Sequence, residues 1–189
     1  MKERLHIQSS TEFLVTILTG LLGVAFYVAL RWIQWPFIMV DLFMLGLLPS
    51  ITIIAIAGAI RGPIAGFLTG YIGEVAYGLL SHGVVVTATL PALAYGIMGF
   101  VVGFARYDLT NGRSLAKLSV LATIGFVFTA LLVTVFGLMV EGAATLAVIG
   151  FVMLPLITLG LPTALFLTPV LARLWHAFMS LALPGYLPE

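Results

Sequence analysis

The chain has 189 residues, of which 62% are apolar and only 8% are charged, and its formal net charge is +1. Soluble domains are about 45–50% apolar and about 25% charged, so the composition excludes an ordinary soluble protein, a disordered chain and a nucleic-acid-binding protein. The absence of cysteine excludes disulfides, thiolate chemistry and cysteine-based metal sites. We therefore expect an integral membrane protein that forms a single domain over residues 1–189.

Six apolar stretches follow one another along the chain. They cover about residues 12–33, 42–60, 63–81, 84–105, 116–139 and 146–174. Each reaches about the 20 residues that a helix needs to cross a ~30 Å hydrocarbon core, and the first is too long for the apolar core of a signal peptide. Backbone groups in lipid must be satisfied within the segment. The sequence therefore predicts an all-α integral membrane protein with six transmembrane helices.

The basic residues predict how these helices are oriented. With six spans, seven of the eight Lys and Arg residues fall on one side of the membrane. They are Lys2, Arg4, Arg61, Arg106, Arg113, Lys117 and Arg173, whereas Arg31 lies on the other side. Because cytoplasmic loops carry an excess of Lys and Arg, we expect both termini to be cytoplasmic in a multi-pass protein of the cell membrane.

Small residues recur at helical spacing in three of the predicted helices. Gly62, Gly66, Gly70 and Gly73 share a face of the third helix, and Gly96, Gly99 and Gly103 share a face of the fourth. Such faces let helix backbones approach closely, so we expect internal packing there. On the first helix, Thr16, Gly20 and Gly23 form one ridge and Ala25 and Ala29 a second. Spacing alone leaves open whether these ridges contact this chain or another membrane protein.

Glu74 is an ionisable residue about two-thirds of the way through the third helix, and Tyr77 shares its face. Ionisable residues at membrane depth are costly and usually functional. Three interpretations remain: ligand binding, a structural hydrogen bond and proton transfer. Arg31 is a candidate partner for either Glu74 or Asp41, and Asp41 is also suited to stabilise the start of the second helix.

The polar residues of the predicted outer side suggest one pocket that is open to the outside. The set comprises Arg31, Trp32, Gln34, Trp35, Asp41, His82 and Glu141, together with Glu74 and Tyr77. An aromatic belt is the alternative interpretation for the two tryptophans, and a solvated loop residue is the alternative for His82.

The sequence has no phosphate-binding glycine loop, no ATPase motif, no HExxH and no Ser-His-Asp set at one depth. We therefore expect no enzymatic activity, no metal site and no cofactor. Pro155, Pro162 and Pro169 recur every seven residues in the sixth stretch, which predicts a kinked or interrupted helix.

Several short motifs resemble the S components of energy-coupling factor (ECF) transporters, the small membrane proteins that capture vitamins. The stretch from Arg61-Gly62-Pro63 to Gly73-Glu74 resembles their third helix. Val40-Asp41-Leu42, leading to Pro49, resembles the segment from loop 1 to helix 2 of riboflavin-type members, and Pro91 with Gly96 and Gly99 resembles their fourth helix. Size, six spans and a short polar loop between helices 4 and 5 agree with this family.

The resemblance implies a substrate-binding subunit that has no energy source of its own. Such proteins bind a vitamin or a related small molecule at the outer face, with loop 1 as a lid. They then dock to a transmembrane coupling protein and two ATPases, which hydrolyse ATP. A small-residue motif on helix 1 contacts the coupling protein, which here implies either the ridge of Thr16, Gly20 and Gly23 or the ridge of Ala25 and Ala29.

The sequence leaves the substrate open. Flavin- and thiamine-binding members use polar side chains on helices 4 to 6, where Tyr95 and several threonines are the candidates. Cobalt and nickel members carry a His directly after the first Met, where this chain has Lys2, so the resemblance implies an organic ligand. Two other functions remain open: a non-transporting six-helix scaffold of the cell-wall or rod-shape type, and a membrane enzyme or self-contained carrier.

Overall fold

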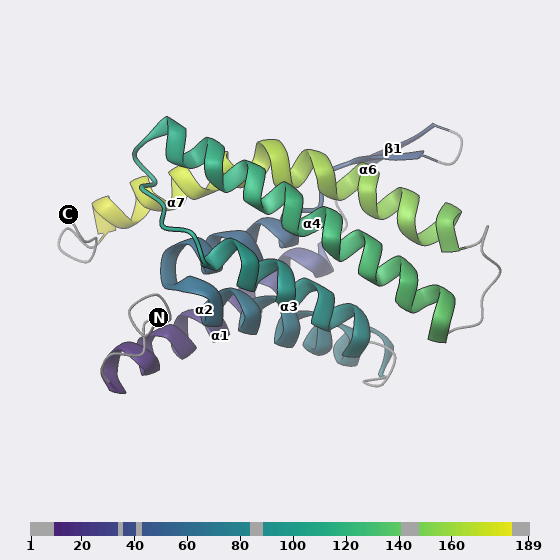
Figure 1. Cartoon of the computed structure of the whole chain (residues 1–189), viewed down its shortest axis with the longest axis horizontal. Helices are drawn as coiled ribbons and strands as arrows, with labels where there is room; N and C mark the ends of the chain where they lie inside the picture. The colour runs from purple at the N-terminus through teal and green to yellow at the C-terminus, as the bar shows by residue number, and fades with distance from the viewer. Residues whose placement is uncertain (1–9, 34–35, 41–42, 84–88, 141–147, 183–189) are drawn as a thin grey trace.

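The computed structural model of the chain describes residues 10–33, 36–40, 43–83, 89–140 and 148–182 (Figure 1). The elements are α1 (Ser10–Trp32), β1 (Phe37–Val40), β2 (Phe43–Gly46), α2 (Pro49–His82), α3 (Thr89–Gly103), α4 (Gly112–Val140), α6 (Leu154–Pro162) and α7 (Thr168–Ala182), with π-helical turns at Ile149–Met153 and Thr163–Leu167. The helices lie side by side along the long axis of the molecule. α1 begins and α7 ends at the same end (Figure 1).

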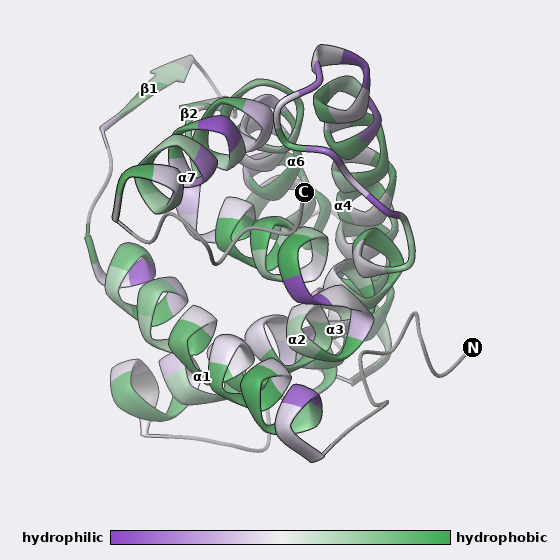
Figure 2. Ribbon diagram, turned by 90° about the vertical axis from the view of Figure 1, so that its left-hand side faces the viewer, coloured by the Kyte–Doolittle hydropathy of each residue, from purple (hydrophilic) through white to green (hydrophobic). Residues whose placement is uncertain are grey.

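Four stretches of helix among the described residues are long and apolar enough to cross a membrane. They are Ser10–Trp32, Pro49–Ser81, Gly112–Met139 and Ile149–Leu181. Figure 2 shows apolar residues along most of the length of every helix and a polar connection between α3 and α4. The chain is therefore largely helical, with several helices that fit a membrane protein, as its composition predicts.

A β-hairpin replaces the start of the second predicted helix, so the prediction of helix from about residue 42 is wrong. β1 and β2 pair antiparallel, with Phe37 opposite Gly46 and Ile38 opposite Leu45. The helix begins only at Pro49, whose fixed φ and missing N–H suit a first helical position. A short apolar run fits a strand as well as a helix, so hydropathy alone does not reveal this boundary.

The chain reverses direction within α2, at Gly62. This residue has φ 83° and ψ −172°, a conformation that is nearly restricted to glycine. A Cβ built on Gly66 would lie only 2.9 Å from the Cα of Gly58, although residues eight apart in a straight helix are about 12 Å apart. α2 therefore consists of two antiparallel arms, residues 49–61 and 63–82, as the Arg61-Gly62-Pro63 turn predicts.

Glycine faces join α1, the second arm of α2 and α3. A Cβ at Gly20 would lie 3.0 Å from the Cβ of Leu68, and a Cβ at Gly73 would lie 2.8 Å from the Tyr27 ring. A Cβ at Gly66 would overlap the backbone of Gly99. The internal packing predicted for the glycines of the third and fourth helices is thus confirmed, except that Gly62 forms the turn before the helix rather than part of its face.

The C-terminal segment is one helix with two π-helical turns. The backbone is right-handed helical at Val148, Leu154, Thr163 and Thr168, which flank these turns. π-turns inside α-helices change the hydrogen-bond pattern locally, and here the helix continues past Pro155, Pro162 and Pro169. The predicted kinked or interrupted helix is thus a continuous helix with two π-helical turns, and it extends to Ala182 rather than to about residue 174.

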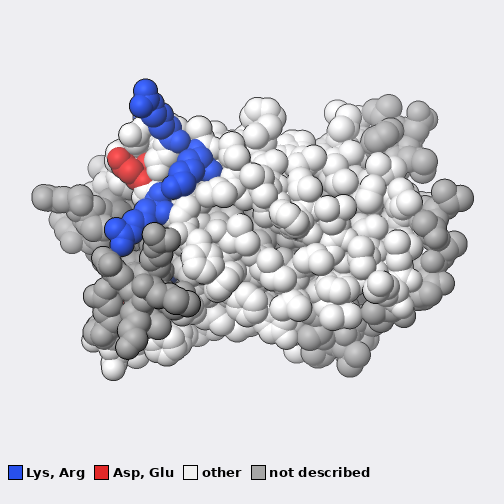
Figure 3. All heavy atoms as spheres, viewed as in Figure 1, with Lys and Arg blue, Asp and Glu red and all other residues white. Residues whose placement is uncertain are grey.

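The number of membrane crossings remains a prediction. The first arm of α2 and α3 are each only about 20 Å long, shorter than a ~30 Å hydrocarbon core. On the face shown in Figure 3, Lys and Arg gather at the end of the molecule where α1 begins and α7 ends. This distribution agrees with the charge asymmetry of the sequence. Six spans and cytoplasmic termini stay predictions.

Candidate polar site

The second arm of α2 carries Glu74 beside α1. Tyr27 donates a hydrogen bond from its hydroxyl to Oε2 of Glu74. The Nη2 of Arg31 lies 4.0 Å from Oε1 of the same carboxylate. The side chains of Glu74 and Arg31 are 13% and 22% exposed, so the ion pair is largely but not fully buried. Of the two partners that the sequence suggests for Arg31, the structure thus shows Glu74.

Helical spacing explains how these side chains meet. Tyr27 follows Gly23 by four residues and precedes Arg31 by four, so all three share one face of α1. Gly73 leaves room for the Tyr27 ring, which brings α1 close to the turn of α2 that carries Glu74. The close contact between Gly73 and Tyr27 therefore positions the Tyr27 hydroxyl beside Glu74.

Two further tyrosines complete the cluster. The guanidinium carbon of Arg31 lies 5.2 Å from the ring centroid of Tyr77, a cation–π distance. The ring of Tyr95, which is 2% exposed, has its centroid 6.5 Å from that of the fully buried Tyr27. We refer to Tyr27, Arg31, Glu74, Tyr77 and Tyr95 as the Glu74 cluster.

The Glu74 cluster presents one acceptor and one cation within a mostly apolar bundle. Taking charges out of water is costly unless they are paired and hydrogen-bonded, and here the carboxylate has both an ion-pair partner and a hydroxyl donor. The structural hydrogen bond predicted for Glu74 is confirmed. Because both charged groups keep some exposure, the arrangement also suits a ligand, whereas ligand binding and proton transfer stay predictions.

The structure brings together only some of the predicted site residues. Arg31, Glu74, Tyr77 and Tyr95 gather around Tyr27, whereas Trp32 at the end of α1 is 61% exposed. His82 is the last residue of α2, and its side chain lies outside the described part of the structure. Gln34, Trp35, Asp41 and Glu141 also lie outside the described residues. A single outer pocket that includes all of them remains a prediction.

Tyr27 is the member of the cluster that the sequence analysis missed. The available signal was its place on the ridge of Thr16, Gly20 and Gly23, since these four are the buried residues of α1. A large polar residue in a row of small residues indicates a specific partner across the helix contact. The partner itself depends on the register between α1 and α2, which spacing does not give.

Buried hydroxyl groups form a second polar cluster, between the start of α2 and the C-terminal helix. The N–H of Leu48 donates to the Thr163 hydroxyl at 2.7 Å, and the Thr168 hydroxyl lies 3.5 Å from that of Thr52. Ser50 is fully buried, and its hydroxyl has no hydrogen-bond partner among the described residues. These contacts fix the start of α2 against the second π-helical turn.

The two small-residue ridges of α1 have different surroundings. Thr16, Gly20 and Gly23 are buried, and Thr69 donates a hydrogen bond to the carbonyl of Gly20 at 3.2 Å. The ridge of Thr16, Gly20 and Gly23 is thus buried against α2 within the chain. It is therefore not accessible for the predicted contact with a coupling protein. Ala25 and Ala29 are exposed and form the ridge that another protein can reach.

A cavity of about 620 Å³ lies between α1, the first arm of α2 and α7. Its lining includes Leu22, Phe26, Ile56, Leu171 and Trp175, and no member of the Glu74 cluster lines it. This apolar cavity and the Glu74 cluster are therefore separate features of the molecule.

Comparison of the chain with protein-family models finds no match, and comparisons with curated proteins and with solved structures find none either.

Proposed function

We propose that this chain is the substrate-capture subunit of an ECF-type ATP-driven importer. It binds a vitamin or a related small organic molecule at the outer face of the membrane. It then docks to a transmembrane coupling protein and two ATPase subunits, which hydrolyse the ATP. The observation that carries the proposal is the Glu74 cluster, because a partly exposed carboxylate inside a helical membrane protein is costly and usually functional.

The position of the β-hairpin supports the proposal. β2 packs against α6 and pairs with β1, away from the end where α1 begins and α7 ends (Figure 1). Gly46 of β2 approaches Leu159 of α6, since a Cβ built on Gly46 would lie 3.0 Å from that side chain. The hairpin belongs to the loop 1 segment for which the resemblance implies a lid, and its β2 strand packs against the C-terminal helix.

The chemistry of the cluster suggests the class of ligand. Glu74 offers a carboxylate to a cationic or hydrogen-bond-donating group, and Arg31 offers donors to an anionic group. The rings of Tyr77 and Tyr95 add aromatic surface. We propose an organic ligand with substantial apolar area and a donor or cationic group that faces Glu74.

Exposed Ala25 and Ala29 are the proposed contact with the coupling protein. Small residues let another helix approach closely in a bilayer. These two residues stand four apart on the side of α1 that α2 leaves uncovered.

Glu74→Gln tests the proposal, because it removes the charge of the carboxylate and keeps its shape. We expect affinity for the captured ligand to fall at least about tenfold, since hydrogen bonds to charged groups contribute about 1.5–3 kcal/mol. Native mass spectrometry or calorimetry on the purified protein measures this change. Glu12→Gln, at the start of α1, is the matched control and should bind like wild type. Equal affinity in the two variants would remove Glu74 from the site.

A non-transporting six-helix scaffold is the second candidate. It is favoured by one observation, namely that Glu74 already has Tyr27 and Arg31 as partners inside the chain. A scaffold predicts that Glu74→Gln lowers the free energy of unfolding and that no compound of a vitamin panel binds the wild type.

A further inference from the structure

The cavity between α1, α2 and α7 is a groove that opens to the side of the bundle, and Figure 2 shows these helices end-on. Leu22 and Phe26 on α1 and Leu174 and Phe178 on α7 line it and remain about half exposed. Ile56 and Ala57 of the first arm of α2 form its nearly buried floor. The rings of Phe26 and Trp175 meet edge to face at 6.5 Å and bridge the two walls.

The lining of the groove excludes water as a stable occupant. Among the described lining residues Thr19 alone carries a hydroxyl, and this hydroxyl donates to the carbonyl of Val15 at 2.8 Å. None of the described residues that line the groove carries a charged side chain. A buried water needs two to four polar partners, and an empty space of this size forfeits dispersion contacts along every wall. The groove therefore suits an uncharged, apolar occupant.

The surroundings of the groove supply such an occupant. Two of its walls, α1 and the C-terminal helix that contains α7, belong to helices that are long and apolar enough to cross a membrane. Its open side lies between these two helices and therefore faces the hydrocarbon of the bilayer. A volume of about 620 Å³ lies in the range of sites for small molecules. A lipid hydrocarbon chain enters from the side without crossing any polar barrier.

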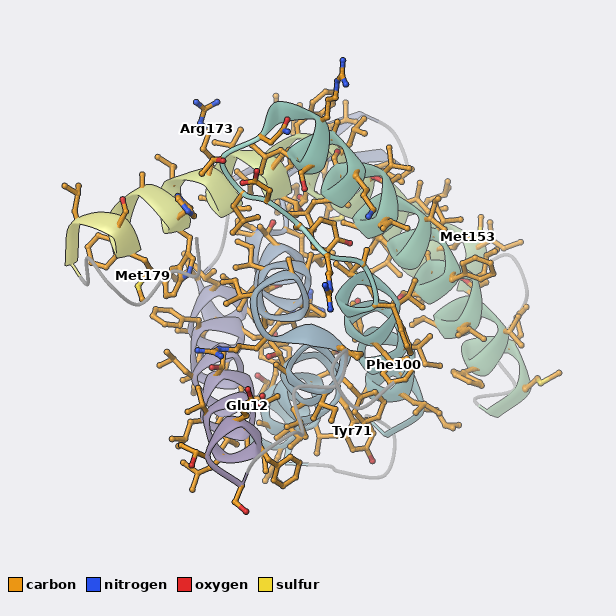
Figure 4. All side chains as sticks on the ribbon, turned by 60° about the vertical axis from the view of Figure 1, so that its left-hand side comes forward. Glu12, Tyr71, Phe100, Met153, Arg173 and Met179 are labelled. Atoms are coloured by element: carbon orange, nitrogen blue, oxygen red, sulfur yellow. The ribbon has the colours of Figure 1, made fainter. Side chains whose placement is uncertain are left out.

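The charges at one end of the groove indicate the headgroup. Ile60 lines the groove and is followed by Arg61. On α7, Arg173 and His176 stand next in sequence to the lining residues Leu174 and Trp175 but do not line the groove themselves. Arg173 is exposed and projects outward from α7 (Figure 4). On the face shown in Figure 3, Lys and Arg gather at the end of the molecule where α7 ends. This excess of positive charge complements an anionic headgroup.

We propose that the groove binds one anionic phospholipid of the adjacent leaflet, with an acyl chain between α1 and α7 and the headgroup at the basic end. The proposal rests on the membrane location of these helices and is independent of the transport function. Lipid binding here would thus persist in a chain that captures no vitamin.

Native mass spectrometry of the protein released from membranes in a mild detergent tests this site. We expect the wild type to retain one phospholipid per chain. After delipidation we expect it to take up phosphatidylglycerol with about tenfold preference over phosphatidylcholine, because only the former carries net negative charge. Leu174→Trp narrows the open edge of the groove and Ala57→Phe fills its floor. Both variants should lose most of the retained lipid.

Val127→Phe is the matched control, because Val127 is 40% exposed on α4, away from the groove lining. It should retain lipid like the wild type. If Ala57→Phe fails to fold, Leu174→Trp decides, since Leu174 is more than half exposed and can be enlarged without overpacking. Equal lipid retention in Leu174→Trp and the control would overturn the proposal. Equal uptake of the two phospholipids, or a stoichiometric co-purifying protein in place of lipid, would also overturn it.

Discussion

At the scale of single residues, the hydroxyl of Tyr27 and the carboxylate of Glu74 form the central polar contact. The sequence alone identifies Glu74, because a carboxylate in an apolar helix is conspicuous. It does not identify Tyr27, because a tyrosine is common in membrane helices and its partner follows from the register of two helices. The burial of Tyr27 is thus the information that only the structure supplies.

Tyr27→Phe should lower the free energy of unfolding by about 1–3 kcal/mol, because Glu74 then lacks one of its donors in a poorly solvated place. Thermal or detergent-induced unfolding followed by circular dichroism measures the change. Tyr71→Phe is the control, since Tyr71 stacks on Phe67 and its hydroxyl has no hydrogen bond to the described residues. Figure 4 shows Tyr71 on the periphery of the bundle. Equal losses in both variants would mean that the Tyr27 hydroxyl contributes nothing specific.

Asp108, in the connection between α3 and α4, predicts a pH dependence of stability. The side chain and backbone N–H of Thr110 donate to its carboxylate at 2.5 and 2.9 Å and hold its pKa below the ordinary value of 3.8. A lowered pKa in the folded state means that the stabilisation is present above about pH 4 and is lost as the pH falls through the folded pKa.

Asp108→Asn removes this titration. The wild type should therefore be more stable than the variant at about pH 6, and the difference should shrink toward about pH 3. Thermal unfolding of the two proteins across this range measures the difference, and comparison of the pair cancels the titration of other carboxylates. A difference that is constant with pH would show that the Thr110 contacts do not act on the charge.

At the scale of elements, glycine positions determine how closely the helices approach. Helical spacing alone predicts the glycine faces of the second arm of α2 and of α3, and the reversal at Gly62 follows from an Arg-Gly-Pro turn. The hairpin at Phe37–Gly46 is not predictable from hydropathy, because its residues are as apolar as those of a helix. Pairing between two short strands is a tertiary contact that local composition does not encode.

Gly66→Ala tests the close approach of α2 and α3. Its new Cβ would overlap the backbone of Gly99, so the helices must move apart. Overpacking of this kind costs about 1–3 kcal/mol, and we expect a corresponding fall in the free energy of unfolding. Gly150→Ala is the control, because nothing lies within 4 Å of a Cβ at that position. Equal stability of both variants would contradict the tight contact.

At the scale of the whole molecule, polar and apolar features are separated. Basic residues gather at one end (Figure 3), the Glu74 cluster lies between α1 and the second arm of α2, and the apolar groove opens between α1 and α7. Composition and charge predict the membrane location, because they sum over the whole chain. The groove is not predictable in this way, since it depends on how far α7 stands from α1.

The measurement that tests the proposed capture function most directly is native mass spectrometry of the gently purified wild-type protein with a vitamin panel added. The Glu74 cluster predicts one small-molecule adduct per chain, carried by a compound with a donor or cationic group and substantial apolar area. A folded protein that retains phospholipid but binds no compound of the panel would contradict capture and favour the scaffold.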